Sequence, residues 1–373
     1  MGGAMPEKMK AVVKTRPELG GDWQEVPLPR IADDEVLVRV RATSICGTDV
    51  HIYKWDPWSA GRIGEQALPQ ILGHEVAGEV VETGAGVKGI HMGDYVSAET
   101  HIPDPQDLQA LLGQMHIGER MKILGVDRDG CFAEYVAIPE VVCWVNDKAI
   151  APEYACVQEP LGNATYAVLG EDNDVAGKSM VFVGDGPISL FAVGVARAVG
   201  VTNIFLVGKY DFNMEIGKRM GADHLLYANK DDVDRIAYIK DHTRGYGADI
   251  VCDMAGSTQA LEEGFQMLRK GGRFTAFGVA GEATVPIDYN NGIVFKGCQV
   301  HGVNGRKMFD TWYRVRNLLS SGRLDIAPVV SHMFPLEEYE QGFEKMIERP
   351  RHAAKVVLFP DRQEFDAAQQ RRA

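Results

Sequence analysis

Hydrophobic and polar residues alternate in several short segments of the first 160 residues. In DEVLVRVRA (34–42), valines alternate with arginines, which is the period of a strand with one buried face. The segment VAGEVVETGAGVKGIHMGDYVSAE (76–99) predicts two strands joined by glycine-rich turns. Because glycine interrupts this region often, we expect a small, strongly bent β-sheet here.

From about residue 163 the pattern changes to short apolar runs separated by helix-like stretches such as NMEIGKRMGA (213–222). Six runs have the length and composition of buried strands. They are SMVFVGDG (179–186), NIFLVGK (203–209), HLLYAN (224–229), ADIVCDMAG (248–256), GGRFTAFGV (271–279) and CQVHGVN (298–304). Strands and helices in regular alternation indicate an α/β unit with a doubly wound, parallel, six-stranded Rossmann sheet.

The last segments return to another pattern. FDTWYRVRNLLSSG (309–322) and LEEYEQGFEKMIER (336–349) have the apolar spacing of amphipathic helices, and AAKVVLFP (353–360) predicts a strand that rejoins the first region. The polar tail 361–373 is expected to fray. We therefore predict two domains, a β-rich one formed by residues 1–162 and 306–373 and a dinucleotide-binding one formed by 163–305.

Composition excludes several classes of function. The net charge of −13 would repel a phosphate backbone, so nucleic acid is not expected as a partner. No run of 18 uncharged apolar residues exists, so no membrane span is expected. The N-terminal MGGAMPEKMK lacks the apolar core of a signal peptide, and the six scattered cysteines contain no C-x-x-C pair. These features favour a cytoplasmic protein without a disulfide framework.

One glycine-rich turn is a candidate dinucleotide site. In VFVGDGPISL, Gly184 and Gly186 follow a predicted strand, and Pro187 and Ile188 open a helix. Glycines at this place allow a tight turn and let a pyrophosphate approach the helix N-terminus. Ser189 replaces the third glycine of the usual motif. The alternative is a glycine turn in a sheet that binds no nucleotide.

The end of the second predicted strand bears on the choice of cofactor. An acidic residue there would hold a ribose 2′-hydroxyl and favour NAD(H), but this strand ends in Gly208 and Lys209. Glycine leaves room for a 2′-phosphate and lysine offers positive charge, so the pattern favours NADP(H) over NAD(H). Asp211 is the alternative acid, and Lys209 is alternatively a solvated surface residue. Tyr227, which ends the third strand, is a candidate to flank the adenine.

Four residues are candidate zinc ligands. They are Cys46 in SICGTDVH, His74 and Glu75 in LGHE, and Glu159 in QEPLGNA. A thiolate, an imidazole and a carboxylate suit an open zinc site that keeps one position for a substrate oxygen. Taken singly each signal is weak, because a lone cysteine or histidine usually has a structural role.

These motifs occur together in a known family. C-G-T-D-x-H, G-H-E-x-x-G-x-V and E-P-L-G-N-A, followed by G-x-G-P-I, resemble the medium-chain, zinc-dependent alcohol dehydrogenases over about residues 10–360. The resemblance implies a GroES-like catalytic domain beside the Rossmann domain. It also implies that Cys46, His74 and Glu159 bind zinc, with Glu75 as a direct or alternating fourth ligand.

The resemblance assigns further roles. Zinc acts as a Lewis acid on the substrate alkoxide, and hydride passes from carbon to the nicotinamide. Thr48 and His51 form a proton relay, in which histidine suits transfer near neutral pH. Phe277, Gly278 and Val279, together with Val303 and Asn304, line the nicotinamide.

Within the family, four blocks support a resemblance to the branch that oxidises L-threonine at its 3-hydroxyl: HIYKWDPWS (51–59), SAETHI (97–102), EPLGNATYAV (159–168) and GRKMFDTWY (305–313). The first and the last of these resemble that branch more than the family at large. Trp55 and Trp58 are candidate pocket walls. Arg306 is a candidate partner of a substrate carboxylate, for which its planar fork is suited. By the same resemblance His101 belongs to the substrate pocket. Ordinary packing or ion pairing is the alternative for each.

The chain departs from the family between two predicted strands. HIPDPQDLQALLGQMHIGER (101–120) stands where most members hold a structural zinc with four closely spaced cysteines, and it contains none. We therefore expect one zinc per chain and no structural zinc. The leucines of QDLQALLGQM (106–115) have helical spacing, which predicts a short helix packed by its apolar face or against a partner subunit.

Two other functions remain open. A polyol, sugar or cyclitol dehydrogenase would share the chemistry, and a non-catalytic, zinc-free relative would have lost the ligands or the relay, which are intact here. The resemblance also implies a homotetramer built from dimers, or a homodimer, with CQVHGVN (298–304) at an interface.

Overall fold

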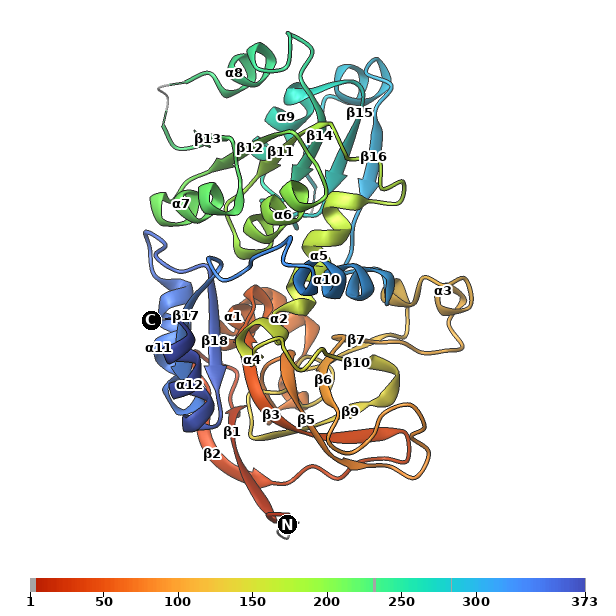
Figure 1. Cartoon of the computed structure of the whole chain (residues 1–373), viewed down its shortest axis with the longest axis vertical. Helices are drawn as coiled ribbons and strands as arrows, with labels where there is room; N and C mark the ends of the chain where they lie inside the picture. The colour runs from red at the N-terminus through yellow and green to blue at the C-terminus, as the bar shows by residue number, and fades with distance from the viewer. Residues whose placement is uncertain (1–4, 231–232, 283, 373) are drawn as a thin grey trace. The chain divides into compact units, whose positions relative to one another are not determined.

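The computed structural model describes residues 5–230, 233–282 and 284–372. Residues 1–4 of the polar N-terminal segment and the last residue of the tail lie outside the described residues. The chain forms two compact units, one of residues 1–159, 330–349 and 355–373 and one of residues 160–329 and 350–354 (Figure 1). The return to the first unit thus lies at residue 330 and not at 306, and the helix predicted over 309–322 belongs to the second unit.

The first unit is built around a bent, largely antiparallel sheet. Its strands run in the order β10-β6-β5-β3-β18-β17, with β9 also paired to β3, and a smaller sheet has the order β2-β1-β4. The strands are β1 (Lys8–Lys14), β2 (Asp22–Pro27), β3 (Glu35–Ile45), β4 (Gln70–Ile71), β5 (Glu75–Thr83), β6 (Tyr95–Ala98), β7 (His101–Ile102), β8 (Lys122–Ile123), β9 (Tyr135–Pro139), β10 (Cys143–Val145), β17 (Val330–Pro335) and β18 (Lys355–Phe359).

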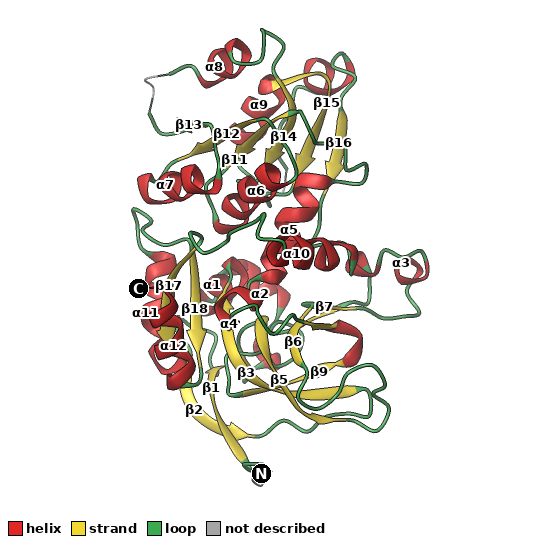
Figure 2. Ribbon diagram, in the orientation of Figure 1, coloured by secondary structure: helices red, strands yellow, loops and turns green. Residues whose placement is uncertain are grey.

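Short helices fill the connections of this unit (Figure 2). They are α1 (Gly47–Lys54), α2 (Pro57–Arg62), η1 (Glu65–Ala67), α3 (Leu108–Leu111), η2 (Met115–Ile117), η3 (Glu140–Val142), α4 (Pro152–Ala155), η5 (Leu336–Glu338), α11 (Tyr339–Ile347) and α12 (Arg362–Arg372). Strand β3 is the centre of the core: Val36, Val38 and Val40 are buried and Arg39 is exposed, as the alternation predicted. Leu37, which the alternation placed on the same face as Arg39, is buried as well, so the alternation holds only in part.

The second unit is the predicted doubly wound sheet. Its six strands are all parallel and run in the order β13-β12-β11-β14-β15-β16, so the strand order reverses between β11 and β14. They are β11 (Ser179–Val183), β12 (Asn203–Gly208), β13 (His224–Tyr227), β14 (Ala248–Asp253), β15 (Leu268–Ala276) and β16 (Gln299–Gly302). Ligands of such sheets bind at the carboxyl ends of the strands, beside this reversal.

Helices cover both faces of this sheet (Figure 2). Helices α6 and α7 pack together against β11 and β12, and α8 and α9 pack together, with α9 against β14 and β15. The helices are α6 (Pro187–Ala198), α7 (Asp211–Met220), α8 (Arg235–Asp241), α9 (Thr258–Met267), the π-helix η4 (Tyr289–Val294) and α10 (Asp310–Ser320); α5 (Gln158–Leu169) joins the two units along the chain. Helix α6 is buried from Ser189 to Ala196, which explains its apolar sequence.

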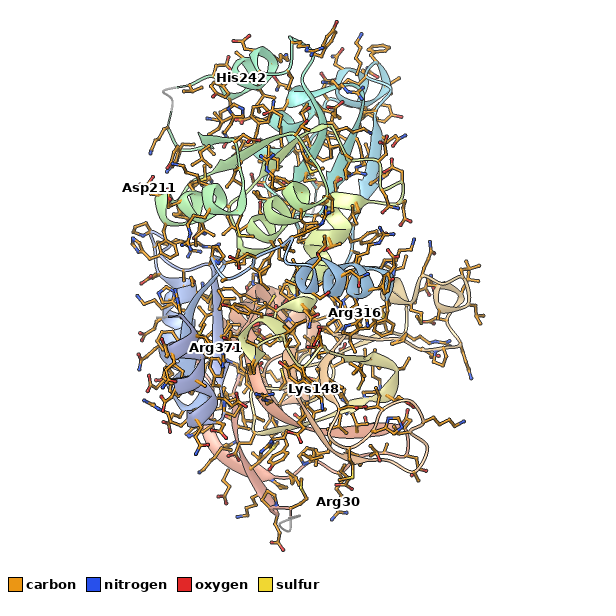
Figure 3. The ribbon with its side chains drawn as sticks, in the orientation of Figure 1. Arg30, Lys148, Asp211, His242, Arg316 and Arg371 are labelled. Carbon is orange, nitrogen blue, oxygen red and sulfur yellow. The ribbon has the colours of Figure 1, made fainter. Side chains whose placement is uncertain are left out.

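The C-terminal segment completes the first unit. Strand β18 is buried throughout and lies between β3, to which it is antiparallel, and β17, to which it is parallel. The tail does not fray: it forms α12, where Ala368 is buried and Arg371 (labelled in Figure 3) makes a bidentate ion pair with Glu153, at 2.8 Å for each bond. The sequence analysis missed this because the tail's anchor is a single carboxylate far away in the sequence.

The segment 101–120 differs from its expected packing. Helix α3 spans four residues, and Leu108, Leu111 and Leu112 are 65–72% exposed, so its apolar face is not buried within the chain. Ion pairs close the segment instead. Arg120 Nε lies 3.0 Å from a carboxylate oxygen of Asp104 and 2.8 Å from one of Asp107, so one guanidinium ties both acids.

The helices and the cysteines bear on two expectations from the sequence, a chain without membrane spans and one without disulfides. None of the helices among the described residues has the length and apolar character needed to cross a bilayer. All six cysteines are free thiols, in agreement with the absence of a disulfide framework.

Candidate active site

Three of the predicted zinc ligands lie together in the first unit. The thiol of Cys46, one ring nitrogen of His74 and one carboxylate oxygen of Glu75 all lie within 4.8 Å of one another. Cys46 follows β3 directly and is the N-cap of α1, while Glu75 is the first residue of the neighbouring strand β5 and His74 precedes it. The antiparallel pairing of these strands, with Ser44 opposite Glu75, brings the two motifs to the same place.

Asp49 positions two of these ligands. Its Oδ2 accepts the backbone N–H of Cys46 at 2.8 Å, and its Oδ1 lies 3.2 Å from Nδ1 of His74. The side chain is fully buried. A carboxylate on one imidazole nitrogen fixes the ring and leaves the other nitrogen to face the cluster.

Glu75 is held by a buried ion pair. Nζ of Lys355, from β18, lies 2.7 Å from Oε1 and 2.5 Å from Oε2, and Ser44 donates its hydroxyl to Oε2. Both charged side chains are at most 2% exposed. Burial raises the pKa of Glu75, an effect that the charge of Lys355 opposes. The carboxylate of Glu75 is therefore held by β18, a strand near the C-terminal end of the chain.

Glu159 lies outside the group of three but close to it. It is buried at the start of α5, where Thr100 donates its hydroxyl to Oε1 at 2.8 Å. Its negative charge is near enough to raise the pKa of Glu75. The donor set of one thiol, one imidazole and carboxylates matches that of an open zinc site, and Asp49 supplies the support that such imidazole ligands have.

The other cysteines near this cluster have structural surroundings. Cys131 lies 3.2 Å from the Thr43 hydroxyl and faces the carbonyl of Glu75. Burial raises the pKa of its thiol to about 12, so it stays protonated at neutral pH. Cys131 is also not a member of the group that Cys46, His74 and Glu75 form.

The two relay candidates share one face of α1. Thr48 and His51 are three residues apart, a spacing that places side chains side by side on a helix. His51 is 55% exposed, and its Nδ1 contacts Oδ2 of Asp56, while its ring lies 5.7 Å from that of Trp58. Asp56 thus orients the imidazole so that the other nitrogen is available for proton transfer.

The substrate candidates have mixed surroundings. Trp55 ends α1 in the left-handed conformation, with Lys14 Nζ 5.6 Å from its ring centroid, and Trp58 is 45% exposed on α2. His101 is half-buried in β7 and is not one of the clustered ligands. Arg306 belongs to the second unit, is buried, and donates to Oδ1 of Asn163 at 2.9 Å.

The second unit holds a cavity of about 360 Å³ at the carboxyl ends of its strands. Gly184 ends β11 with φ +123°, where a Cβ would lie 3.1 Å from the backbone of Met254. Gly186 caps α6 without a side-chain bond, so the first N–H groups of this helix are directed at the cavity rim. These glycines and this helix start fit a pyrophosphate.

The ribose end of the cavity is lined by the residues that follow β12. Gly208 and Lys209 line it, as the sequence analysis expected, together with Asp185 from the glycine turn. Tyr227 is not among the described lining residues. Its hydroxyl interacts with Asp211, and Lys230 Nζ lies 3.5 Å from its ring centroid.

The residues expected around the nicotinamide follow neighbouring strands. Phe277, Gly278 and Val279 come directly after β15, and Val303 and Asn304 after β16. The N–H groups of Phe277 and Gly278 are bonded to the carbonyl of Asp253 at 3.1 and 2.8 Å, and Val279 is 90% exposed. These segments therefore lie at one edge of the sheet, in line with β14.

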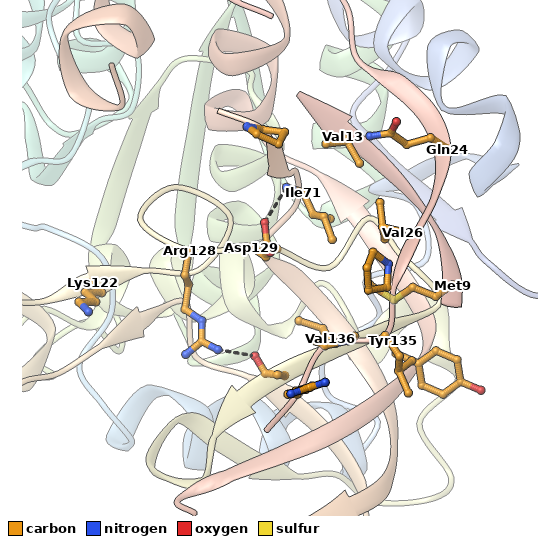
Figure 4. Close-up of a pocket in the computed structure, with 17 residues that line it drawn as sticks. Met9, Val13, Gln24, Val26, Ile71, Lys122, Arg128, Asp129, Tyr135 and Val136 are labelled. Carbon is orange, nitrogen blue, oxygen red and sulfur yellow. Dashed lines mark hydrogen bonds between the residues drawn. The ribbon is translucent and has the colours of Figure 1, made fainter. Parts of the chain in front are cut away.

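Another cavity of the first unit, with a volume of about 620 Å³, lies away from these residues (Figure 4). No candidate zinc ligand is among its described lining residues. Two of its charged residues bond to the protein itself, since Asp129 accepts the N–H of Ile71 and Arg128 binds Ala137 and Glu35. This cavity offers no group for the chemistry under consideration.

Sequence reasoning missed four residues that act on the candidate sites: Asp49, Asp56, Asp185 and Lys355. The clearest signal was Lys355, a single charge within an apolar strand, because a buried lysine requires a buried acid. The aspartates lie within the quoted motifs, but their partners are set by turns and caps that spacing does not specify.

Comparisons with known proteins agree with this geometry. The alcohol dehydrogenase GroES-like domain matches residues 32–147, and the zinc-binding dehydrogenase model matches residues 187–321. An L-threonine 3-dehydrogenase from Bacillus velezensis is 45% identical over 95% of this chain and 100% of its own. One from Caldanaerobacter subterraneus is 44% identical over 94% and 99%. The structure of 2R,3R-butanediol dehydrogenase from Bacillus subtilis superposes with a TM-score of 0.84 at 26% identity, over 95% and 100% of the chains.

Proposed function

Because the chain belongs to the medium-chain, zinc-dependent alcohol dehydrogenase family, we propose that it oxidises the 3-hydroxyl of L-threonine to 2-amino-3-oxobutanoate with a nicotinamide dinucleotide. The dehydrogenase class follows from the family. The choice of substrate rests on the relatives, which are L-threonine 3-dehydrogenases and which this chain matches over nearly their full length. The cluster of the partly buried Cys46 with the buried His74 and Glu75 is the structural observation that supports it most directly.

Zinc would be held by Cys46, His74 and Glu159, with Glu75 as an alternating ligand. When bound, it supplies Lewis acidity that stabilises an alkoxide oxygen. Asp49 orients His74 and the Cys46 loop, while Lys355 and Ser44 hold Glu75 in place.

Thr48 and His51 would move the alcohol proton. The Thr48 hydroxyl takes the proton as the alcohol loses it, and His51 passes it to solvent, to which its ring is exposed. Asp56 keeps one ring nitrogen engaged, so the exchange uses the other. Trp55, Trp58 and His101 would line the substrate.

A polyol dehydrogenase is the second candidate. Arg306, the residue expected to bind a substrate carboxylate, is buried and bonded to Asn163, which weakens the case for an amino acid. The structural similarity to a butanediol dehydrogenase, whose substrate carries no carboxylate, also favours a neutral diol. The zinc cluster and the relay serve either substrate equally.

We also propose one zinc per chain, a homo-oligomer and a cytoplasmic location. The first rests on the lobe of residues 101–120, which lacks cysteine and is tied by Arg120. The second rests on the three exposed leucines of this lobe, and the third on six free thiols. Metal analysis by mass spectrometry should give one zinc per chain, and light scattering a dimer or tetramer.

A substrate screen tests the function. Zinc-loaded enzyme is assayed with L-threonine, 2,3-butanediol and a panel of sugar alcohols, each with NAD⁺ and NADP⁺, by the absorbance of reduced nicotinamide. Threonine should give the highest kcat/KM. Thr48→Val should lower kcat by about 10²–10⁴, and Thr48→Ser, which keeps the hydroxyl, should retain most of it. A higher kcat/KM with a diol would contradict the threonine proposal alone.

A further inference from the structure

Helix α12 lies beyond residues 10–360, the part of the chain that resembles the family. It packs against β17 and β18 (Figure 1). Glu364, Ala368 and Arg371 follow one another at helical spacing, so their side chains share one face of the helix. Ala368 is buried, which shows that this face is turned towards the protein. We call these three residues the inner face of α12.

The inner face makes two ion pairs with elements that lead to candidate zinc ligands. Oε1 of Glu364 lies 2.6 Å from Nε of Arg41 in β3, the strand that ends just before the zinc cluster. Arg371 donates to both carboxylate oxygens of Glu153 in α4, at 2.8 Å for each bond. Glu153 is fully buried, and no other cation among the described residues pairs with it. A buried carboxylate requires such a partner, so the position of α4 depends on Arg371.

Helix α4 connects this ion pair to the zinc cluster. It packs against β3 and β5, the two strands whose pairing forms the cluster. Glu153 precedes Glu159 by six positions, with the buried Cys156 between them. The hydroxyl of Ser44, which donates to Glu75, is also hydrogen-bonded to the thiol of Cys156. A shift of α4 therefore reaches two carboxylates, Glu159 through the chain and Glu75 through Ser44.

We propose that α12 is a C-terminal strap for the metal site, and that Arg371 is a positioning residue that acts through Glu153. The strap follows β18, which supplies Lys355 to Glu75, and ties this strand to α4, which leads to Glu159. Groups that orient metal ligands from behind are typically worth about 10–100-fold in metal affinity or activity. The proposal rests on the proposed zinc site and adds to it a helix outside the family resemblance.

A purely structural role of the ion pair is the competing explanation. Arg371→Ala leaves a buried charge unpaired, which by itself destabilises the first unit. Adding Glu153→Gln removes that charge, so the stability should return in the double variant under either explanation. The tie between α12 and α4 is still missing from the double variant. Its metal site should therefore recover only if the ion pair serves stability alone.

Metal binding to the full chain, without alcohol or dinucleotide, tests the proposal. The dissociation constant of zinc is measured by competition with a chromophoric chelator, and the visible absorption of cobalt(II) bound in place of zinc reports the ligand geometry. Arg371→Ala and the double variant should each weaken zinc binding by about tenfold or more and change the cobalt spectrum. Arg362→Ala is the matched control on the same helix. It removes an arginine whose ion pairs with Glu338 and Asp366 lie at the surface, and both readouts should stay unchanged.

Melting temperatures of the zinc-free samples separate the two explanations. The double variant should melt close to the unchanged chain and still bind zinc weakly. Recovery of zinc affinity together with stability would overturn the proposal, as would equal zinc affinities of Arg371→Ala and Arg362→Ala. If Arg371→Ala does not fold, the double variant, which has no unpaired buried charge, decides the question. Absence of zinc binding in the unchanged chain would instead overturn the proposed dehydrogenase itself, so the two failures are distinguishable.

Discussion

At the scale of single residues, the candidate zinc site depends on one lysine. Lys355 is the counter-charge of Glu75, and it also donates to the carbonyl of Ile45 at 3.1 Å. A buried ion pair contributes little net stability compared with apolar residues, but the loss of one partner leaves the other charged and unpaired. Lys355 is thus needed less for its own attraction than to make a buried Glu75 tolerable.

Removal of this charge should destabilise the first unit. Lys355→Met keeps the apolar stem and should lower the free energy of unfolding by about 3–5 kcal/mol, measured by urea denaturation. Lys345→Met is the matched control: it removes a lysine that pairs with Glu348 at the surface, for about 0–1 kcal/mol. Adding Glu75→Gln to Lys355→Met should restore most of the loss. If the two lysine variants lowered the free energy of unfolding equally, the loss of Lys355 would be no more destabilising than the loss of a surface lysine, and the prediction would be wrong.

At the scale of elements, ion pairs close the lobe between β7 and β8, and we call this group of residues the clasp. Arg120 bridges Asp104 and Asp107, and its backbone N–H also bonds to Oδ2 of Asp107 at 2.8 Å. The clasp closes the ends of the lobe but leaves α3 exposed. Charged surface contacts of this kind hold a loop less firmly than a four-thiolate zinc.

Loss of the clasp should loosen only this lobe. Arg120→Ala should raise the rate of thermolysin cleavage between residues 103 and 121 by about threefold or more, since local opening controls cleavage of an exposed loop. The melting temperature should change by no more than about 2 °C. Lys122→Ala, an exposed lysine two residues away, is the control. Equal cleavage of both variants would contradict the role of Arg120.

Strand β13 contains a histidine, His224, that should make the stability of the second unit depend on pH. His224 is bonded between Tyr238 and Asn203, at 3.0 and 3.1 Å, and burial together with the nearby His242 lowers its pKa. The unfolded chain therefore takes up a proton first. The stability due to neutral His224 is complete above about pH 6.5 and is lost as the pH falls towards the lower pKa of the folded state.

A variant isolates this contribution. The free energy of unfolding is measured from pH 7.5 to 5 for the unchanged chain and for His224→Gln. The unchanged chain should lose more stability over this range than the variant, while His91→Gln, at an exposed turn, should follow the unchanged chain. A parallel course for His224→Gln would show that His224 does not contribute.

At the scale of the whole molecule, the chemistry is divided between two compact units. All candidate zinc ligands belong to the first, and all residues of the ribose cavity belong to the second. Each unit has its own buried core, one around β3 and β5 and one around β11, β12 and β14. Metal binding and dinucleotide binding are therefore separable properties of the chain.

Zinc removal should demonstrate this separation. After treatment with a chelator, dehydrogenase activity should fall to background, and the melting temperature should fall because bound metal stabilises the folded state. The dissociation constant of ADP-ribose, measured by calorimetry, should change by less than about twofold. A large loss of ADP-ribose affinity in the zinc-free protein would contradict independent sites.

The sequence predicted the architecture well because that information is local. All six Rossmann strands and the glycine turn follow from short motifs and their periods, and the resemblance to the family implied that Cys46 and His74 lie together. It predicted poorly what depends on distant partners: the domain return at 330, the docking of α12 on Glu153, and the exposure of the lobe's leucines. The zinc roles of all four candidate ligands, the relay of Thr48 and His51, and the cofactor and substrate contacts stay predictions.

The pairing of Glu75 with Lys355 also has a consequence for biosynthesis. The two residues are separated by 280 positions, so the ribosome must finish almost the whole chain before the acid meets its counter-charge. At about 5–20 residues per second, that interval is roughly 15–55 s. The second unit is nearly all encoded between them and can fold first. During this interval the first unit lacks β18 and Lys355, so we expect its candidate metal ligands to be accessible to chaperones and to cellular zinc.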